Sequence, residues 1–318
     1  MSIGAVLILR NEEATTERCV RSVGWASALV VHDTGSDSDA TMDLAARTAE
    51  EIGVPWAWGR DKWSDFSTNR NLALTHARKA FPDVAYFLSL DADETAELAP
   101  GANPDCLEAD LVYLDMVNLN QRQWVPRLIK AHSLLMWQGR CHEHPFAEGA
   151  SSERWEGIRI THHGDGHDSV DNRRLHRNEG LLRKDLVEHP DDPRLLAYLA
   201  QTLMGLGKHR QAYKLFRRRA GMVAFEEEAW WAQYQAGLCQ LAYGDWAGVD
   251  TLLRACDRRP WRGEPLADLA TFYYQHNCHE LAKFFASAAD SLPYPTTDSL
   301  FIENALYNHD LRAVLDAD

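Results

Sequence analysis

The sequence lacks the features of a disulfide-rich protein and of a membrane protein. Its 318 residues include only six cysteines, and no two of them form a Cys-x-x-Cys pair. Such scattered cysteines argue against a zinc cluster or a disulfide scaffold and are typical of reduced thiols in a cytoplasmic protein. The apolar run at residues 3–9 is far shorter than the roughly 18 residues that a membrane span needs. We therefore expect a soluble, cytoplasmic protein with no signal peptide and no membrane span.

The chain also lacks an overall positive charge. It has 33 Lys and Arg against 47 Asp and Glu, which gives a formal net charge of −14. This balance disfavours nonspecific binding to nucleic acid or to an anionic membrane as the main activity. One segment differs, because residues 170–219 carry 12 bases and 6 acids, a net charge of 12 − 6 = +6. That excess suits a solvated helix face, and it leaves open a face that meets an anionic donor or acceptor.

Strand and helix patterns alternate in the first half of the chain. Apolar runs predict strands at residues 3–9, 28–32, 54–58 and 84–90, and helical patterns lie between them at 12–23, 37–52 and 64–80. Ser36 is the expected N-cap of the second helix, and Ser64 or Asp65 that of the third. The alternation predicts βαβ crossovers and a mixed, mainly parallel sheet, with ligands at the carboxyl ends of its strands. Shorter strands are expected at 111–117, 124–129, 134–138 and 157–160.

Strand patterns stop after about residue 169, and paired helices follow. Tight turns are expected at Gly207-Lys208, Gly244-Asp245, Asn277-Cys278 and Asn308-His309, spaced 37, 33 and 31 residues apart. This spacing is close to the tetratricopeptide period. We therefore predict an α/β domain over residues 1–168 and an all-α, tetratricopeptide-like repeat domain over residues 169–318.

Polar clusters follow each predicted strand, and the pair Asp91-x-Asp93 is the most informative of them. Two carboxylates this close repel each other unless a cation or basic side chains lie between them. Mg²⁺ and Mn²⁺ prefer oxygen ligands and bind through one or two carboxylates together with phosphate oxygens. The pair therefore suits a metal–diphosphate site, although the tripeptide alone is common. Glu94 directly behind it has no evident role in the sequence.

Seven motifs in a fixed order carry a more specific signal than any one of them. They are LILRNEE, VVHDTGSDSD, W-x-DFSTNRN, YFLSLDADE, VPRLIK, WQGRCHE and THHG. Together they resemble glycosyltransferase family 2, the nucleotide-sugar-dependent enzymes of the GT-A (Rossmann-like) fold, in the branch that carries C-terminal tetratricopeptide-like helices. One position departs from this pattern, because Asp165 stands where an aromatic residue is expected.

The resemblance implies a donor-binding side of the site. Asn11 or Glu12 and Asp33 would hold the nucleobase and ribose, most simply of a UDP-sugar. Arg70 would neutralise the donor phosphates, which a guanidinium fork suits better than lysine does. Asp91 would contact the ribose or a metal-bound water.

The resemblance also implies a metal and a base. Asp93 would bind Mn²⁺ or Mg²⁺ directly, with Asp91 beside it. His162 would be the third protein ligand, in preference to its neighbour His163. Glu143 is the candidate base that deprotonates the acceptor in an inverting transfer, and His142 is the alternative.

The resulting expectation is a metal-dependent inverting glycosyltransferase. Its acceptor, a protein, peptide or saccharide, would be presented near the helical repeats. A hydroxylated base in DNA is an alternative acceptor that the basic segment leaves open. A noncatalytic repeat scaffold with a relic nucleotide-binding domain is the rival from another class. A nucleotidyltransferase is disfavoured, because the first strand is not followed by a glycine- and lysine-rich phosphate loop.

Overall fold

The computed structural model describes residues 1–37, 40–118, 121–166, 173–298 and 300–307. The chain divides into two compact units, Met1–Arg174 and Leu175–Asp318. The predicted boundary between residues 168 and 169 lies outside the described residues. Each unit is described here by itself.

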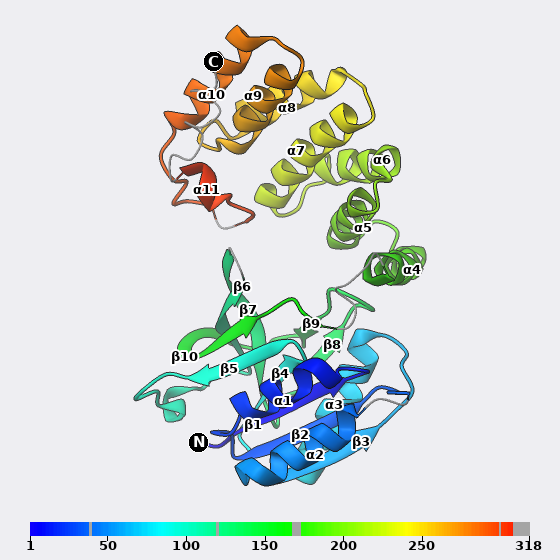
Figure 1. The fold of residues 1–318 in the computed structure, drawn as a ribbon, viewed down its shortest axis with the longest axis vertical. Coiled ribbons are helices and arrows are strands. Elements are labelled where there is room, and N and C mark those ends of the chain that lie inside the picture. Colours follow the sequence, from blue (N-terminus) through cyan, green and yellow to red (C-terminus); the bar gives the residue numbers. More distant parts are fainter. Residues whose placement is uncertain (38–39, 119–120, 167–172, 299, 308–318) are drawn as a thin grey trace. The chain divides into compact units, whose positions relative to one another are not determined.

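The first unit is built on one eight-stranded sheet with the strand order β3-β2-β1-β4-β7-β6-β10-β5 (Figure 1). The strands are β1 (Ile3–Leu9), β2 (Ala28–Asp33), β3 (Trp56–Arg60), β4 (Tyr86–Asp91), β5 (Glu94–Leu98), β6 (Leu111–Asn118), β7 (Gln121–Lys130) and β10 (Ser152–His162). The half β3-β2-β1-β4 is parallel throughout, and β7 joins it antiparallel to β4. The expected mixed, mainly parallel α/β arrangement is therefore confirmed for this half.

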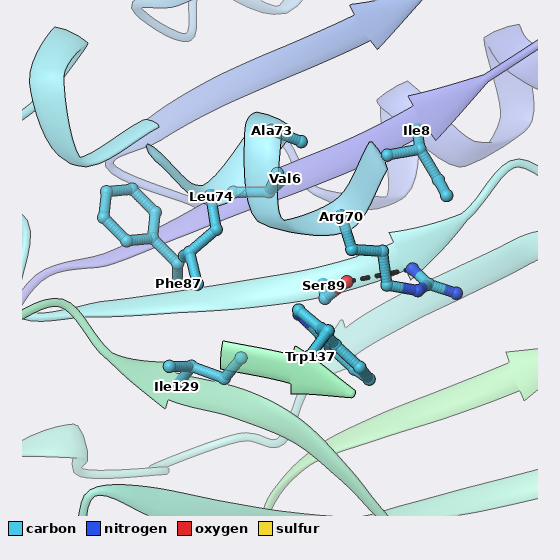
Figure 2. Close-up of a pocket in the computed structure, with 9 residues that line it drawn as sticks. All are labelled: Val6, Ile8, Arg70, Ala73, Leu74, Phe87, Ser89, Ile129 and Trp137. Carbon is cyan, nitrogen blue, oxygen red and sulfur yellow. Dashed lines mark hydrogen bonds between the residues drawn. The ribbon is translucent and has the colours of Figure 1, made fainter. Parts of the chain in front are cut away.

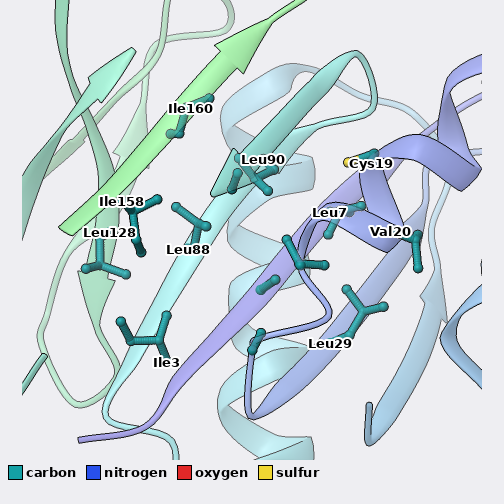
Figure 3. Close-up of a cluster of buried hydrophobic side chains, with 14 of the residues drawn as sticks. Ile3, Leu7, Cys19, Val20, Leu29, Leu88, Leu90, Leu128, Ile158 and Ile160 are labelled. Atoms are coloured by element: carbon teal, nitrogen blue, oxygen red, sulfur yellow. The ribbon is translucent and has the colours of Figure 1, made fainter. Parts of the chain in front are cut away.

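Three helices cover the two faces of the parallel half: α1 (Glu13–Ser22), α2 (Thr41–Ile52) and α3 (Phe66–Ala80). Side chains of α1 and α2, such as Cys19 and Ala45, pack with Leu7 and Leu88 in one buried cluster (Figure 3). Side chains of α3 pack with the alternate residues of the same strands, such as Val6 and Phe87, in a second cluster. Because successive side chains of a strand point to opposite faces, both faces of this sheet are apolar and buried.

The helix starts are only partly as predicted. Asp65 caps α3, and its carboxylate accepts a hydrogen bond from the Thr68 N–H at 2.8 Å. Ser36 does not cap α2, so that prediction was wrong. The helix begins at Thr41 without a side-chain cap, and the Ser36 hydroxyl instead accepts a hydrogen bond from the Asn11 N–H at 3.0 Å.

Two short segments were not predicted as strands. Glu94–Leu98 forms β5, which pairs with β10 at the far edge of the sheet. The Ala96 N–H donates to Ser22 Oγ at the end of α1, and the Trp25 Nε1–H, in the turn after α1, donates to the Ala96 carbonyl. His144–Phe146 forms β9, which pairs with β8 (Met136–Gln138) in a separate two-stranded sheet. A 3₁₀ turn, η1, spans Pro104–Cys106.

The second unit is a series of helix pairs. Its helices are α4 (Arg173–Glu188), α5 (Pro193–Gly205), α6 (His209–Ala220), α7 (Glu226–Ala242), α8 (Ala247–Arg258), α9 (Glu264–Gln275), α10 (His279–Asp290) and the short α11 (Asn304–Tyr307). The turns predicted at 207–208, 244–245 and 277–278 join α5 to α6, α7 to α8 and α9 to α10, so the helical repeat is confirmed. The fourth turn, Asn308-His309, lies outside the described residues. Within those residues, no helix combines the length and the apolar character required to cross a bilayer.

Candidate functional site

A buried arginine lies at the bottom of the candidate site, at the carboxyl end of β4. Arg70 projects from the first turns of α3, and its side chain is 3% exposed. Its guanidinium donates to Ser89 Oγ at 3.0 Å and to Asp91 Oδ1 at 2.6 Å. Ser89 and Asp91 are two residues apart on one strand and therefore point to the same face, so a single guanidinium can bond both. This explains why the strand ends in a carboxylate on the α3 side.

A second arginine holds the other side of Asp91. The guanidinium of Arg127, on the neighbouring strand β7, lies 3.0 Å from Asp91 Oδ2 and 2.7 Å from Glu94 Oε1. Glu94 is 1% exposed, and its second oxygen accepts a hydrogen bond from the Asp91 N–H at 2.9 Å. Glu94 had no predicted role, and Arg127 was not among the predicted site residues. The structure places both within the ion cluster of Arg70, Asp91, Arg127 and Glu94.

These contacts set the ionisation of the acids. Burial opposes ionisation of Asp91, but the charges of Arg70 and Arg127 outweigh it and hold the pKa of this carboxyl well below its usual range. Burial raises the pKa of Glu94 to about 7, and the charge of Arg127 offsets only part of that shift. Asp91 is thus a fixed anion whose oxygens are both engaged by arginines.

Asp93 lies beyond this cluster and faces His162. The turn Ala92-Asp93 connects β4 to β5, and His162 ends β10 directly opposite Glu94 in the antiparallel pair. His162 Nδ1 lies 3.7 Å from Asp93 Oδ1. This nitrogen is buried, and none of the described residues provides it with a hydrogen-bond partner. Burial raises the pKa of Asp93, the charge of His162 opposes that shift, and the charge of Asp91 adds to it.

The pair formed by Asp93 and His162 can hold a cation only with help from a ligand. Within the described residues, no three His, Cys, Asp or Glu side chains gather to hold a metal by themselves. Of the expected trio, Asp91 is engaged by the two arginines, whereas Asp93 and the unpartnered nitrogen of His162 face each other. Mg²⁺ and Mn²⁺ commonly complete such a partial protein shell with phosphate oxygens and water. The residues present therefore fit a divalent cation that arrives with a diphosphate.

The candidate base Glu143 is also bound to Arg70. Its Oε1 accepts a hydrogen bond from Arg70 Nε at 2.6 Å, and the side chain is 10% exposed. The Trp137 ring stacks against the same guanidinium, 5.0 Å from its central carbon. His142 precedes Glu143 and is exposed, with a backbone φ of +52°. Arg70 therefore links Glu143 to Asp91. For Arg70 to contact a donor phosphate as predicted, its bond to Glu143 or its bond to Asp91 would have to break.

The predicted nucleobase-binding residues organise two neighbouring loops. Asp33 is 1% exposed, and its Oδ1 accepts hydrogen bonds from the N–H groups of Gly35 and Ser36 at 3.0 and 2.7 Å. Its Oδ2 lies 3.1 Å from Arg60 Nε. The Asn11 amide oxygen accepts a hydrogen bond from the Asp37 N–H at 2.9 Å, which ties the loop after β1 to the loop after β2.

Glu12 lies at the start of α1, on the same pair of loops. Its N–H donates to Thr41 Oγ1 at 2.8 Å, and its carboxylate accepts a hydrogen bond from the Thr15 hydroxyl at 2.9 Å. Asn11, Glu12 and Asp33 therefore lie at adjoining strand ends, and all three bond to protein groups.

A small pocket lies on the α3 side of the sheet, behind the ion cluster (Figure 2). Its volume is only about 10 Å³, and Arg70, Ser89 and Trp137 are its polar or amphipathic lining. The rest of the lining is aliphatic or aromatic, from β1, α3, β4 and β7. Pockets for drug-sized ligands typically enclose about 300–1,000 Å³. This pocket is therefore too small for a nucleoside diphosphate sugar, and a donor would have to bind on the outer side of the cluster.

Asp165, which stands where an aromatic residue was expected, pairs with Arg18. Its carboxylate accepts two hydrogen bonds from the Arg18 guanidinium of α1, at 2.8 and 2.6 Å. The next residue, Gly166, lies so close to Asp93 that an added Cβ would come within 3.1 Å of its carboxylate oxygen. The Arg18–Asp165 pair therefore ties the segment after β10 to α1 beside Asp93.

Comparison with known proteins corrects the family assignment. No family model matches the chain. Similar solved structures include MamA (21% identity over 37% of this chain and 67% of MamA, TM-score 0.32) and YrrB, described as a TPR protein with an unusual peptide-binding site (16% identity over 36% of this chain and 58% of YrrB, TM-score 0.33). Similarity this low carries no conclusion about activity or partners. Because no family model matches the chain, that of glycosyltransferase family 2 included, the assignment to this family was wrong. Seven short motifs, each with a local structural role, do not define a family.

Proposed function

We propose that the first unit transfers a sugar from a nucleoside diphosphate donor, most simply a UDP-sugar, with the help of Mn²⁺ or Mg²⁺. The observation that carries the proposal is the pair formed by Asp93 and His162 Nδ1, 3.7 Å apart beside the carboxyl end of β4, with Glu94 Oε1 3.9 Å from the same nitrogen, to which no described residue gives a hydrogen bond. Ligands of α/β sheets gather at such strand ends. A GT-A type of sheet is part of this proposal, and the parallel order β3-β2-β1-β4 supports it.

The charge of the site supports a divalent cation. Four carboxylates (Asp91, Asp93, Glu94 and Glu143) are linked through direct contacts with two guanidiniums and one histidine. With neutral histidine and all four acids ionised the sum is −4 + 2 = −2, and it becomes −1 when Glu94, whose pKa burial raises to about 7, is protonated. Either charge would repel an anionic donor that came alone. A cation bound between Asp93 and His162 would neutralise the diphosphate and stabilise it as the leaving group.

The two arginines have a positioning role in this proposal. Arg70 and Arg127 hold Asp91 as an anion and turn it away from Asp93, so Asp91 orients the strand end while Asp93 stays available to a ligand. The N–H groups that bond Asp33 fix the loop after β2, beside the loop of Asn11 and Glu12. A nucleoside would lie against these two loops, with its diphosphate toward Asp93.

Glu143 is the proposed base for an inverting transfer. The Arg70 guanidinium fixes its Oε1 by a hydrogen bond of 2.6 Å, and the carboxylate would accept a proton from an acceptor hydroxyl. His142 is the alternative base, because it is adjacent and exposed. An acceptor peptide or saccharide held by the helical repeats would complete the reaction, since stacked helices form extended binding surfaces.

Turnover of nucleotide sugars tests this proposal. Each of a panel of UDP- and GDP-sugars is incubated with the full chain and Mn²⁺, and release of the nucleoside diphosphate is measured. Asp93→Ala should abolish Mn²⁺-dependent release, and Glu143→Gln should retain donor binding while it loses transfer. Unchanged release by Asp93→Ala would exclude the cation site, and normal transfer by Glu143→Gln would exclude Glu143 as the base.

A further inference from the structure

A segment near the C-terminus of the chain is held by contacts to its main chain and to two of its side chains. Residues 292–298 and 300–303, the described part of this segment, contain neither helix nor strand. The segment is held by α7 and by the connection between α8 and α9. Its contacts therefore come from side chains of other elements and not from secondary structure of its own.

A carboxylate pocket binds Asp298. Its Oδ1 accepts hydrogen bonds from Arg259 Nη1 at 2.7 Å and from Trp261 Nε1 at 3.1 Å, and its Oδ2 accepts one from Arg262 Nη1 at 3.2 Å. The Arg262 side chain is fully buried, and Asp298 is 2% exposed. Three donors of fixed geometry around one carboxylate form a site that selects an acid over an amide or an alkyl group.

The main chain of the next residues is recognised as well. Arg262 donates to the carbonyls of Leu300 and Phe301 at 3.1 and 3.0 Å, and the Leu300 N–H donates to Glu227 Oε1. These bonds do not depend on the side chains of the segment. They require only a peptide main chain in the same conformation and register.

An aromatic platform receives Phe301. Its ring stacks on Trp231 of α7 with centroids 4.3 Å apart and planes inclined by 28°. Phe301 nevertheless remains 41% exposed, and its backbone φ of +50° lies in the left-handed region that disfavours aromatic residues. Phe301 thus buries little apolar surface and carries backbone strain, so this end of the segment is held less firmly than Asp298 is.

We propose that Trp231, Arg259, Trp261 and Arg262 form a recognition site for a peptide of the pattern Asp-x-aliphatic-aromatic on a partner protein. The chain's own Asp298-to-Phe301 sequence occupies this site and competes with that peptide. The proposal does not depend on sugar transfer. The competition is strong, because an attached segment acts at an effective concentration on the order of millimolar. A partner would bind well only where its peptide fits better than the chain's own strained segment.

Binding of a labelled peptide in trans tests this inference. The probe is a fluorescent peptide with the sequence of residues 294–303, YPTTDSLFIE, and its anisotropy is measured with the full chain. The double variant Asp298→Ala/Phe301→Ala should bind the probe at least about tenfold more tightly than the wild type does, because charge-assisted bonds and the ring stack no longer favour the attached segment. A probe with alanine in place of its Asp and Phe should not bind. Adding Arg259→Ala to the double variant should weaken binding again.

A second variant covers the case in which the double variant fails to fold. Phe301→Ala alone removes an exposed ring and leaves the buried carboxylate pocket filled. It should tighten probe binding about three- to tenfold, the range expected for one aromatic pair. If both variants keep the circular dichroism of the wild type and neither binds the probe more tightly than the wild type, the inference is overturned.

Discussion

Arg70 shows how one residue connects several parts of the site. Its guanidinium contacts Ser89, Asp91 and Glu143, and the Trp137 ring covers it. Burial disfavours its charge, but the two carboxylates outweigh burial and raise its pKa above the ordinary value. The charge is therefore permanent, and its removal would leave Glu143 without its counter-ion and Asp91 with Arg127 alone.

The variant Arg70→Met should destabilise the first unit by about 3–5 kcal/mol, the usual cost of breaking a buried ion pair from one side. Urea denaturation followed by tryptophan fluorescence would measure this loss. Arg21→Met is the matched control, because Arg21 pairs with Glu17 and Glu51 at the exposed surface of α1 and should contribute little. Equal denaturation midpoints for the two variants would contradict the assignment of Arg70 as the central cation.

His32 predicts a pH dependence of stability. It is 2% exposed on β2, and its Nε2 lies 3.2 Å from Asp61 Oδ2. Burial lowers the pKa of His32, the charge of Asp61 opposes this shift, and His76 adds to it. The folded chain therefore binds fewer protons than the unfolded chain does. The resulting stability is present above the ordinary pKa near 6.5 and is lost as the pH falls below it.

The free energy of unfolding should accordingly decrease as the pH is lowered from 7.5 to 5.5 (about one unit on either side of the ordinary pKa). The variant His32→Gln should show a smaller decrease over the same range. Urea titrations at several pH values would measure both slopes. If the slopes are the same, another group is responsible for the pH dependence.

At the scale of elements, apolar periodicity was sufficient to predict β1, β2, β4 and α3. The three strands are runs of buried residues, the buried residues of α3 recur at helical spacing, and all four have clear boundaries. It missed β5, since ETAEL contains two acids and has only five residues. Glu94 reads as a surface acid in the sequence, yet it is buried because Arg127, 33 residues later, neutralises it. No local pattern contains such a long-range pairing, although an arginine in an otherwise apolar strand was a signal that could have been used.

The site residues likewise include features that the sequence predicted and features that it did not. The sequence predicted which strand ends carry polar side chains, and the structure brings Asp91, Asp93 and His162 to one region. Asp91, however, faces arginines, and Glu143 shares Arg70 with it. These partnerships depend on which face of each strand a residue occupies and on the order of the strands in the sheet. Neither follows from spacing along the chain alone.

Glycines in the helical unit give a test at the element scale. Helices α7 and α8 approach closely at Gly248, where an added Cβ would lie 2.7 Å from the Gly237 carbonyl oxygen. Gly180 in α4 has open space around the same position. Gly248→Ala should therefore destabilise the unit by about 1–3 kcal/mol through overpacking. Gly180→Ala should stabilise it by about 0.5–1 kcal/mol, because alanine favours the helix.

Thermal unfolding monitored by circular dichroism would compare the two glycine variants. Opposite changes in melting temperature are expected. A similar change in both would show that helix propensity, and not the close approach of α7 and α8, determines the effect.

At the scale of the whole molecule, the chain combines two units with different means of recognition. The sheet unit places an excess of carboxylates at one group of strand ends, and in the proposed function a bound cation would offset them before an anionic ligand binds. The helical unit presents arginine and tryptophan side chains that bind a peptide carboxylate and an aromatic ring. The net charge of −14 of the chain disfavours polyanions as ligands of either unit.

The most direct test of the central claim is calorimetric titration of UDP into the full chain, with and without Mn²⁺. The metal–diphosphate site predicts binding in the presence of Mn²⁺ and at least about tenfold weaker binding when Mn²⁺ is omitted, since the uncompensated acids repel the diphosphate. Asp93→Asn should lose the Mn²⁺-dependent part of the affinity, whereas Asp83→Asn, at an exposed aspartate eight residues before β4 ends, should retain it. UDP binding that is equally strong without Mn²⁺, or unchanged in Asp93→Asn, would contradict the account.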